Sequence, residues 1–309
     1  MARSVETVLL LGRNVLAHDV ARRLAAAGDH ERRVITVSTT GESAPGERDL
    51  DLSSSFGAGT LSQMLQELRP STLVLLAFSE SPLTPAQPWL HDAAIADAVV
   101  SATRKCAELR SRLPGIIALS STAVYGVAPR SPLLFDEAHA ASPAAPSASA
   151  CDLWAEGLRQ AESALLSLRE ELRVAVGVLR CASVVGGPVD SPLQAWMRAS
   201  PPVRVLGFDP PVQLLHYDDL VDAIVLAVEQ RLSQVLNIVG RGAVSLSRLL
   251  ALAGMVSLPL PGPLADRLTS PAMDGKRLRW RSLADGRRAM QVLGFRPVRG
   301  TEETLRARR

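Results

Sequence analysis

Short apolar runs alternate with longer segments of helical spacing along most of the chain. An uninterrupted apolar run is typical of a strand that is buried on both faces of a parallel sheet. Strands that alternate with helices form βαβ units, so we expect an α/β fold with a doubly wound parallel sheet. The expected strands are 7–11, 33–38, 48–52, 72–78, 115–120, 173–179, 203–206 and 234–239, and the expected helices are 15–27, 61–68, within 89–113, 150–169, 193–198, 218–229 and 246–253.

The segment 115–126, GIIALSSTAVYG, changes from apolar to hydroxylated at its carboxyl end. Open parallel sheets bind ligands at the carboxyl ends of their strands. Ser120, Ser121 and Thr122 are therefore the first candidates for chemistry. The alternative is an ordinary strand end whose hydroxyl groups cap a turn.

The bulk composition limits the classes of partner. The 309 residues suffice for one large domain or two, and 47% hydrophobic residues with only 4% aromatic ones predict an aliphatic core. The net charge of +3 is too small to indicate a nucleic acid or an anionic membrane as partner. Lysine occurs only at Lys105 and Lys276, so nearly all basic side chains are arginines.

The cysteines and the apolar runs bear on location. Cys106, Cys151 and Cys181 match no metal-binding spacing, and such a sparse, odd set is typical of a reducing cytoplasm. We therefore expect a cytoplasmic protein with no metal site. Glu6 stands beside the first apolar run, so we expect a first strand there rather than a signal peptide. No apolar run approaches the length of about 18 residues that spans a membrane.

Five segments together carry a family resemblance. In this order and spacing the chain resembles an extended short-chain dehydrogenase/reductase of the NAD-dependent epimerase/dehydratase type. The segments are SSTAVYG (120–126), VLRCASVVGGP (178–188), LLHYDDLVDAI (214–224), VLNIVG (235–240) and LGFRP (293–297).

The resemblance implies an architecture and a cofactor. It implies a Rossmann-type nucleotide-binding domain made of residues 1–180 together with 214–240, and a smaller substrate-binding part made of 181–213 and 241–309. NAD or NADP is the implied cofactor, and a nucleotide-linked sugar or a similar small molecule is the implied substrate. The family also dimerises by pairing two long helices, which correspond here to 89–113 and 150–169.

The first loop departs from the family motif TGxxGxxG, whose glycines let the backbone approach the pyrophosphate. Gly12 remains, whereas Val15 and His18 take the places of the other two glycines. Val15 is β-branched and narrows the approach. The helix N-terminus still offers free N–H groups, Asn14 is a candidate N-cap, and Arg13 is either a phosphate contact or a solvated loop charge.

The resemblance assigns further residues to the cofactor, but it does not separate NAD from NADP. The residues after the second strand, 38–40, are Ser-Thr-Thr and contain neither the acid nor the arginine that would decide. Asp49 is either an adenine-side contact or a turn carboxylate. The cofactor set is completed by Leu50, Ala77, Phe78, Ser120, Cys181 and Val184.

The family's YxxxK motif is absent from the sequence. That motif sets a tyrosine and a lysine on one helix face, where the ammonium group favours the tyrosinate that exchanges a proton. The chain has two tyrosines, and the residues four places after Tyr125 and Tyr217 are Pro129 and Val221. The usual oxidation chemistry therefore lacks its two main groups.

Counting back from Glu162, which resembles a glutamate of the family's helix, the tyrosine place falls on Trp154 and the lysine place on Leu158. Trp154 is then either an aromatic plug in a former active site or a substrate platform. Ser121 matches the substrate-orienting hydroxyl and is the one catalytic candidate that remains.

Two further residues complete the expected substrate side with Trp154. They are Thr122 and His216, and we expect His216 to pack and cap at the base of the cleft. Asp152 and Glu156 share a helix face and form either a carboxylate pair or a solvated face. Cys151 and Cys181 have no identifiable histidine partner.

Three functions remain open. The first is a divergent family member that holds a nucleotide without Tyr–Lys catalysis. The second is an active NAD(P)-dependent oxidoreductase or epimerase that uses Ser121. The third is an interaction module without nucleotide, with Trp89, Trp196 and the loop 127–149 as its contact surface.

Overall fold

The computed structural model describes residues 5–12, 14–27, 32–39, 48–77, 88–139, 149–188, 191–198, 201–268, 277–280 and 283–306. A parallel sheet of seven strands lies at its centre, in the order β12-β7-β5-β4-β1-β2-β3. This order starts near the middle and winds outward in both directions, which confirms the expected doubly wound sheet. The strands are β1 (Glu6–Gly12), β2 (Arg32–Ser38), β3 (Arg48–Asp49), β4 (Thr72–Leu76), β5 (Gly115–Ser121), β7 (Val176–Cys181) and β12 (Val235–Ile238).

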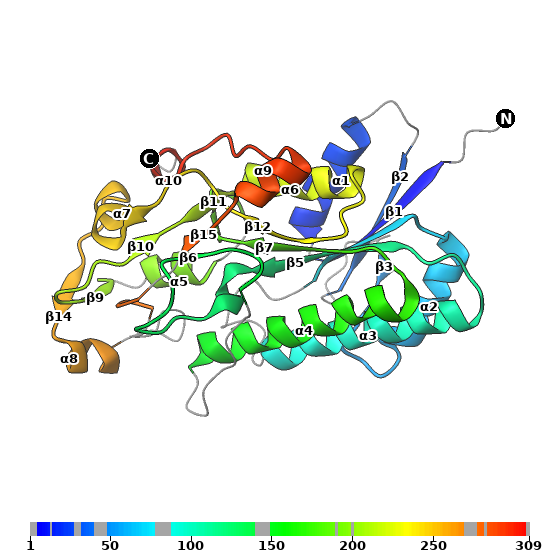
Figure 1. Cartoon of the computed structure of the whole chain (residues 1–309), viewed down its shortest axis with the longest axis horizontal. Coiled ribbons are helices and arrows are strands. Elements are labelled where there is room, and N and C mark those ends of the chain that lie inside the picture. The colour runs from blue at the N-terminus through cyan, green and yellow to red at the C-terminus, as the bar shows by residue number, and fades with distance from the viewer. Residues whose placement is uncertain are drawn as a thin grey trace.

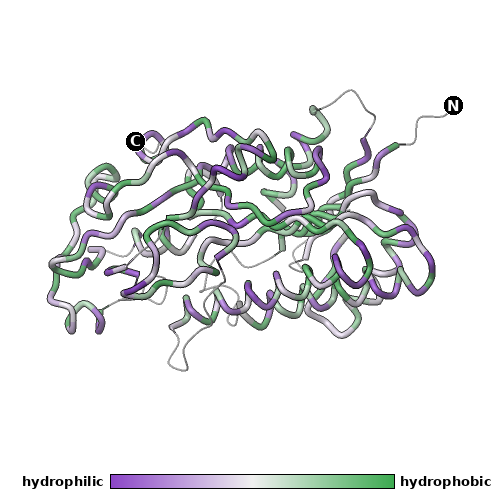
Figure 2. The backbone as a smooth tube through the Cα atoms, in the orientation of Figure 1, coloured by the Kyte–Doolittle hydropathy of each residue, from purple (hydrophilic) through white to green (hydrophobic). Residues whose placement is uncertain are grey.

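Helices cover both faces of this sheet (Figure 1). On one face α2 (Gly57–Leu68) packs against α3 (Pro88–Glu108), which packs against α4 (Ala150–Leu172). On the other face α6 (Tyr217–Glu229) contacts both α1 (Asn14–Ala26) and α9 (Arg287–Leu293). The strands between them are strongly hydrophobic (Figure 2), and every residue of β4 is buried. The aliphatic core expected from the composition therefore lies between the sheet and its two helical layers.

A second, smaller core lies beside the sheet and includes Trp196, Leu246 and Leu305. Trp196 is only 1% exposed, so the expectation that it forms a contact surface is wrong; its indole fills this core instead.

The division of the chain into two domains stays a prediction. The elements outside the main sheet and its helices are η1 (Thr122–Tyr125), β6 (Leu134–Phe135), β8 (Ser183–Val185), α5 (Pro192–Arg198), β9 (Val203–Val205), β10 (Pro211–Val212), β11 (Leu214–His216), β13 (Val244–Ser245), α7 (Leu246–Leu252), β14 (Leu258–Leu260), α8 (Gly262–Arg267), β15 (Leu283–Ala284) and α10 (Thr301–Arg306).

Several expected boundaries shift for one physical reason. The strand expected from residue 173 begins at Val176, because Arg173 caps α4 in the left-handed conformation. The helix expected within 89–113 ends at Glu108, and Arg110 also has a positive φ.

Among the helices of the described ranges, none is both long and apolar enough to cross a membrane.

Candidate nucleotide and substrate site

The turn after β1 is shaped by strand packing. Gly12 lies beside Leu76 of β4, and a Cβ atom on Gly12 would lie 2.6 Å from the Leu76 Cβ. A side chain at this position is therefore excluded by the neighbouring strand itself. Asn14 is the first residue of α1 rather than the residue before the helix, and Arg13 lies outside the described residues.

The first turns of α1 differ from a glycine-lined phosphate loop. Val15 is 53% exposed and His18 is also exposed, so both side chains stand clear of the core. No acidic residue lies in the first turn of α1, so the positive end of the helix is not neutralised there. The loop retains helix N–H groups for an anion but presents a β-branched side chain beside them.

The other cofactor candidates lie at the carboxyl ends of neighbouring strands. Asp49 ends β3, and its Oδ1 accepts a hydrogen bond from the Leu50 amide at 3.0 Å. Leu50 is buried, and so is Ala77, which directly follows β4. Phe78 lies outside the described residues. Because parallel strands end at one edge, Gly12, Asp49 and Ala77 share the edge at which such sheets bind nucleotides.

A buried ion pair lies behind the hydroxylated end of β5. The Ser120 Oγ donates to the Glu162 Oε1 at 2.5 Å, and the Arg180 Nη2 donates to the Glu162 Oε2 at 2.7 Å. All three residues are at most 8% exposed. Burial lowers the pKa of Arg180, but the hydrogen bonds and charge of Glu162 outweigh it and raise that pKa overall. The hydroxyl of Ser120 therefore serves as a hydrogen-bond donor to the carboxylate of this ion pair.

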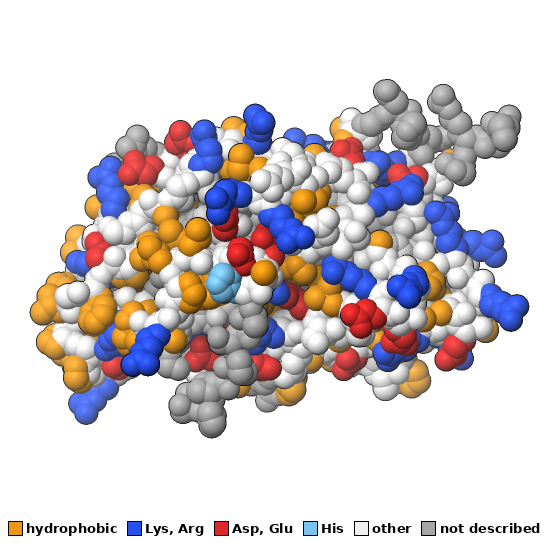
Figure 3. All heavy atoms as spheres, in the orientation of Figure 1, with side chains coloured by type: hydrophobic (Ala, Val, Ile, Leu, Met, Phe, Trp, Pro, Cys, Tyr) orange, Lys and Arg blue, Asp and Glu red, His pale blue; other side chains and the backbone are white. Residues whose placement is uncertain are grey.

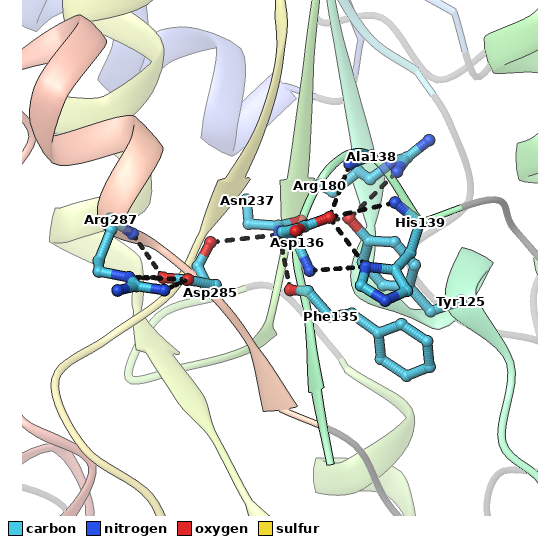
Figure 4. Close-up of polar contacts among 9 residues, drawn as sticks. All are labelled: Tyr125, Phe135, Asp136, Ala138, His139, Arg180, Asn237, Asp285 and Arg287. Carbon is cyan, nitrogen blue, oxygen red and sulfur yellow. Dashed lines mark hydrogen bonds and ion pairs between the residues drawn. The ribbon is translucent and has the colours of Figure 1, made fainter. Parts of the chain in front are cut away.

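Tyr125 extends the same network toward β12 (Figure 4). Its hydroxyl donates to the Asn237 Oδ1 at 2.8 Å and accepts from the Arg180 Nη1 at 3.1 Å. Its ring stacks on Phe135 with centroids 4.9 Å apart, and the Asn237 amide donates to the carbonyl oxygens of Phe135 and Asp285. Tyr125 is 3% exposed, and burial raises the pKa of its hydroxyl. A buried phenol with both partners fixed is not placed to exchange protons with a substrate.

The network fixes which face of α4 meets the sheet. Trp154, Leu158 and Glu162 follow one another at spacings of four residues, so they share a helix face. Glu162 contacts Ser120, so this face points toward the carboxyl end of β5. Trp154 is 6% exposed and Leu158 is 1% exposed. An indole and an isobutyl group therefore fill the positions expected for the tyrosine and lysine.

The hydroxyl groups after Ser120 have different surroundings. Ser121 is the N-cap of η1, and its Oγ accepts a hydrogen bond from the Ala123 amide at 3.2 Å. This is the turn-capping role that the sequence left open. Thr122, the next residue, is half-buried.

Each carboxylate at the start of α4 is held by an arginine. Asp152 accepts from the Arg277 Nη1 at 3.2 Å, and Glu156 accepts from Arg159 with 2.5 Å between Nη2 and Oε2. Arg159 also donates to the Val124 carbonyl oxygen at 3.0 Å. Asp152 and Glu156 are thus each engaged by an arginine, with side chains 13% and 30% exposed.

His216 caps a helix. It precedes α6, its Nδ1 accepts from the Asp218 amide at 3.1 Å, and its side chain also contacts Arg299. Burial and the nearby Arg299 charge lower the pKa of His216. The residue is 4% exposed, so it packs and caps as expected. Cys181 and Val184 are buried too, and burial raises the pKa of the Cys181 thiol well above its usual range.

The residues that the sequence did not single out are the partners in this network. Arg180 and Asn237 lie inside the VLRCASVVGGP and VLNIVG segments, which assign them no role, and Asp285 lies outside all five segments. The signal available was their presence in two of the five segments. A contact such as that between Tyr125 and Asn237, which are 112 residues apart, gives no local pattern.

A comparison with models of protein families identifies the family of this chain. The model of the NAD dependent epimerase/dehydratase family matches residues 12–239. The chain belongs to this family. The match covers the seven-stranded sheet from the end of β1 to β12, and with it the network around Glu162. The family is NAD-dependent by its description, which agrees with the cofactor class expected from the resemblance.

Solved structures of epimerases and dehydratases share the fold. MoeE5 in complex with UDP-glucuronic acid and NAD is 22% identical, with a TM-score of 0.66, over 97% of this chain and 96% of that one. The UDP-glucose-4-epimerase of Stenotrophomonas maltophila with bound NAD is 16% identical, with a TM-score of 0.71, over 97% and 96%. The dTDP-glucose 4,6-dehydratase of Bacillus anthracis with NAD is 13% identical, with a TM-score of 0.70, over 98% and 95%.

The curated relatives match this chain over only part of its length and part of their own. Uncharacterized proteins of Mycobacterium tuberculosis and Mycobacterium bovis are 28% identical over 148 residues, which is 48% of this chain. The match spans 38% of those relatives' own length.

Proposed function

We propose that this epimerase/dehydratase family chain binds a nicotinamide dinucleotide at the carboxyl edge of its sheet without performing Tyr–Lys chemistry, and acts as a binding or regulatory protein. The observation that carries the proposal is the pair Trp154 and Leu158. Both are buried on the face of α4 that meets β5. An indole has no acid of useful pKa, and an isobutyl group has no charge.

The edge of the sheet fits the cofactor in part. Gly12, the N–H groups at the start of α1, Asp49, Leu50 and Ala77 are the groups that would hold a dinucleotide. The exposed Val15 stands against tight binding of the pyrophosphate, since it occupies the place of a family glycine. When bound, the cofactor supplies hydride transfer, and this chain's own residues orient it. We therefore expect weaker binding than a glycine-lined loop would give.

The loss of catalysis follows from the groups that remain. Removing a general acid–base group typically costs about 10²–10⁴-fold in rate. Ser121 caps η1, and the hydroxyl of Tyr125 is held by Arg180 and Asn237. A serine hydroxyl alone is a poor acid or base, and the Tyr125 hydroxyl is already engaged as both donor and acceptor.

Thermal unfolding with nicotinamide cofactors tests the binding half of the proposal. The purified chain is heated with NAD, NADH, NADP or NADPH at millimolar concentration. Cofactor at 100 times its dissociation constant stabilises by about 2.7 kcal/mol, which moves the midpoint by a few degrees. An Asp49→Asn variant should lose part of that shift. An unfolding midpoint that none of the four cofactors changes would overturn the proposal that the chain binds a nucleotide. The interaction module without nucleotide would then be the alternative that remains.

Turnover tests the other half. The chain is incubated with NAD and either UDP-glucose or UDP-glucuronic acid, and the products are separated by chromatography. We expect no conversion above a protein-free control. An active oxidoreductase or epimerase is the second candidate, which is favoured by the half-buried residue Thr122 directly after Ser121 at the same strand end. Conversion that is lost in a Ser121→Ala variant would establish this second candidate.

We also propose that the chain forms a homodimer through α3 and α4, in a reducing compartment such as the cytoplasm. The two helices lie side by side on the outside of the molecule (Figure 1). The three cysteines, Cys106, Cys151 and Cys181, are free and buried, which supports a reducing location. Sedimentation equilibrium measures the oligomeric state directly, and a monomer at all concentrations would contradict the dimer.

A further inference from the structure

A cleft of about 270 Å³ opens at the amino edge of the sheet, opposite to the candidate nucleotide site. It lies beneath four neighbouring strands, β4, β5, β7 and β12. The segments that line it are 71–72, 112–117, 172–175 and 231–232, each at or just before the start of one of these strands. Among the described residues, none of the candidates for the nucleotide or substrate site lines this cleft.

The cleft has an apolar floor and a basic rim. Ile116 and Val174 on the floor are buried, at 0% and 6% exposure. Arg112, Arg173 and Arg231 line the cleft and are all exposed. The face shown in Figure 3 carries several basic side chains, interspersed with acidic ones, around the end of the molecule where β1 begins.

Few acidic groups compete for these arginines. The side chains of Arg112 and Arg173 make no hydrogen bond or ion pair with any other residue in the described ranges. Arg231 lies 3.5 Å from the Glu6 carboxylate, but its side chain is 72% exposed. Glu6 is shared with Arg32, which it meets at 3.3 Å. Among the charged side chains in contact within the described ranges, the rim therefore sets three guanidinium groups against one shared carboxylate.

Backbone conformation marks two of these arginines, Arg173 and Arg231. Among the described residues, the non-glycine residues with positive φ are Arg69, Arg110, Arg173 and Arg231, at 44°, 53°, 57° and 49°. Each follows a helix that leads into a strand, where glycine is the usual residue. A cation near a helix C-terminus also suits the helix dipole, and this explanation applies equally to all four. Arg173 and Arg231 differ from the other two in that they line the cleft.

We propose that this cleft binds a phosphate monoester with a compact apolar body. The planar guanidinium fork matches phosphate oxygens and can bind them in a bidentate manner. Three guanidinium groups against one shared carboxylate favour a doubly charged anion over a singly charged one. The apolar floor takes the body of the ligand, which is small because the cleft lies just below the range of about 300–1,000 Å³ typical of drug-sized ligands.

Isothermal titration calorimetry of the full chain with phenyl phosphate tests the proposal. We expect binding of phenyl phosphate, weaker binding of inorganic phosphate, which lacks the apolar body, and no binding of phenol, which lacks the charge. An Arg173→Gln substitution should weaken the binding of phenyl phosphate about tenfold, since a hydrogen bond to a charged group is lost. Circular dichroism of each variant checks that the fold is retained.

Two controls separate the cleft from general surface charge. Arg69→Gln and Arg110→Gln remove exposed arginines of the same left-handed conformation that do not line the cleft, and they should leave the affinity unchanged. Equal weakening in these controls would overturn the proposal, and so would the absence of any heat with phenyl phosphate. Competition of NAD with phenyl phosphate would also overturn it, because that result assigns the anion to the opposite edge of the sheet.

Discussion

Ser120 and Glu162 lie 2.5 Å apart, from Oγ to Oε1, and this contact joins strand β5 to the helix α4. The same carboxylate receives the guanidinium of Arg180 from β7. A carboxylate and a guanidinium buried together are stable only while both are present, because each would otherwise lack its counter-charge. The pair therefore fixes the rotation of α4, and with it the burial of Trp154 and Leu158.

Removing one partner of this ion pair should be costly. We expect Glu162→Gln to lower the free energy of unfolding by about 3–5 kcal/mol, because Arg180 keeps a buried charge without its carboxylate. The double variant Glu162→Leu/Arg180→Leu should recover most of that loss, since no charge remains buried. Urea unfolding followed by circular dichroism measures both.

The matched control is an exposed ion pair of similar geometry. Arg104 on α3 donates two hydrogen bonds to Glu171 on α4, with side chains 48% and 40% exposed. Glu171→Gln should cost less than about 1 kcal/mol, as is usual for surface pairs. Losses of similar size at Glu162 and Glu171 would contradict the role assigned to the buried network.

Trp154 offers a second test of the packing at the candidate site. Trp154→Ala should lower the free energy of unfolding by about 3–5 kcal/mol, because a buried indole leaves a cavity. A substrate platform on a cleft wall would lose far less stability and would instead lose ligand affinity. Urea unfolding with and without cofactor separates the two. Stability that stays within about 0.5 kcal/mol of the original chain would favour the platform over the plug.

Most of the main sheet was predictable because its strands, apart from β3 (Arg48–Asp49), contain apolar runs that can be recognised without knowing their partner strands. Strands β8 and β11 were not predicted, because they pair with each other in a separate two-stranded sheet, and a pairing between distant segments gives no local pattern. The strand start at 173 was misplaced because an arginine gives no local sign of a left-handed conformation, as a glycine would. Trp196 was misjudged because its burial depends on a core assembled from distant segments.

The candidate site was likewise predictable only in part. The turn-capping alternative for Ser121 and the packing role of His216 both followed from local rules about hydroxyls and helix starts. The network of Glu162, Arg180 and Asn237 did not, because it joins three elements far apart in the chain. Local patterns thus indicated which segments matter, and only the packing gave the partners.

The glycine of the first loop provides a third prediction. Gly12→Ala should destabilise the fold by about 1–3 kcal/mol, because the added Cβ would meet the Leu76 Cβ at 2.6 Å and the Leu76 carbonyl carbon at 2.9 Å. The loss should already be present without cofactor, since its cause is strand packing. Gly59→Ala on α2 is the control, because a Cβ there meets nothing within 4 Å and alanine should stabilise the helix by about 0.5–1 kcal/mol. A Gly12→Ala variant of full stability that no longer binds nucleotide would contradict this account.

The fourth prediction concerns pH and the helix cap at His216. Burial and the Arg299 charge lower the folded-state pKa of His216 below its ordinary 6.5. As pH falls below about 6.5, the unfolded chain therefore binds a proton before the folded chain does, and stability is lost. A His216→Asn variant keeps a side-chain acceptor for the N-cap but does not titrate. Its free energy of unfolding should fall less between about pH 7.5 and 5.5 than that of the original chain. Urea unfolding at several pH values within this window gives both slopes, and equal slopes would show that His216 does not carry the pH dependence.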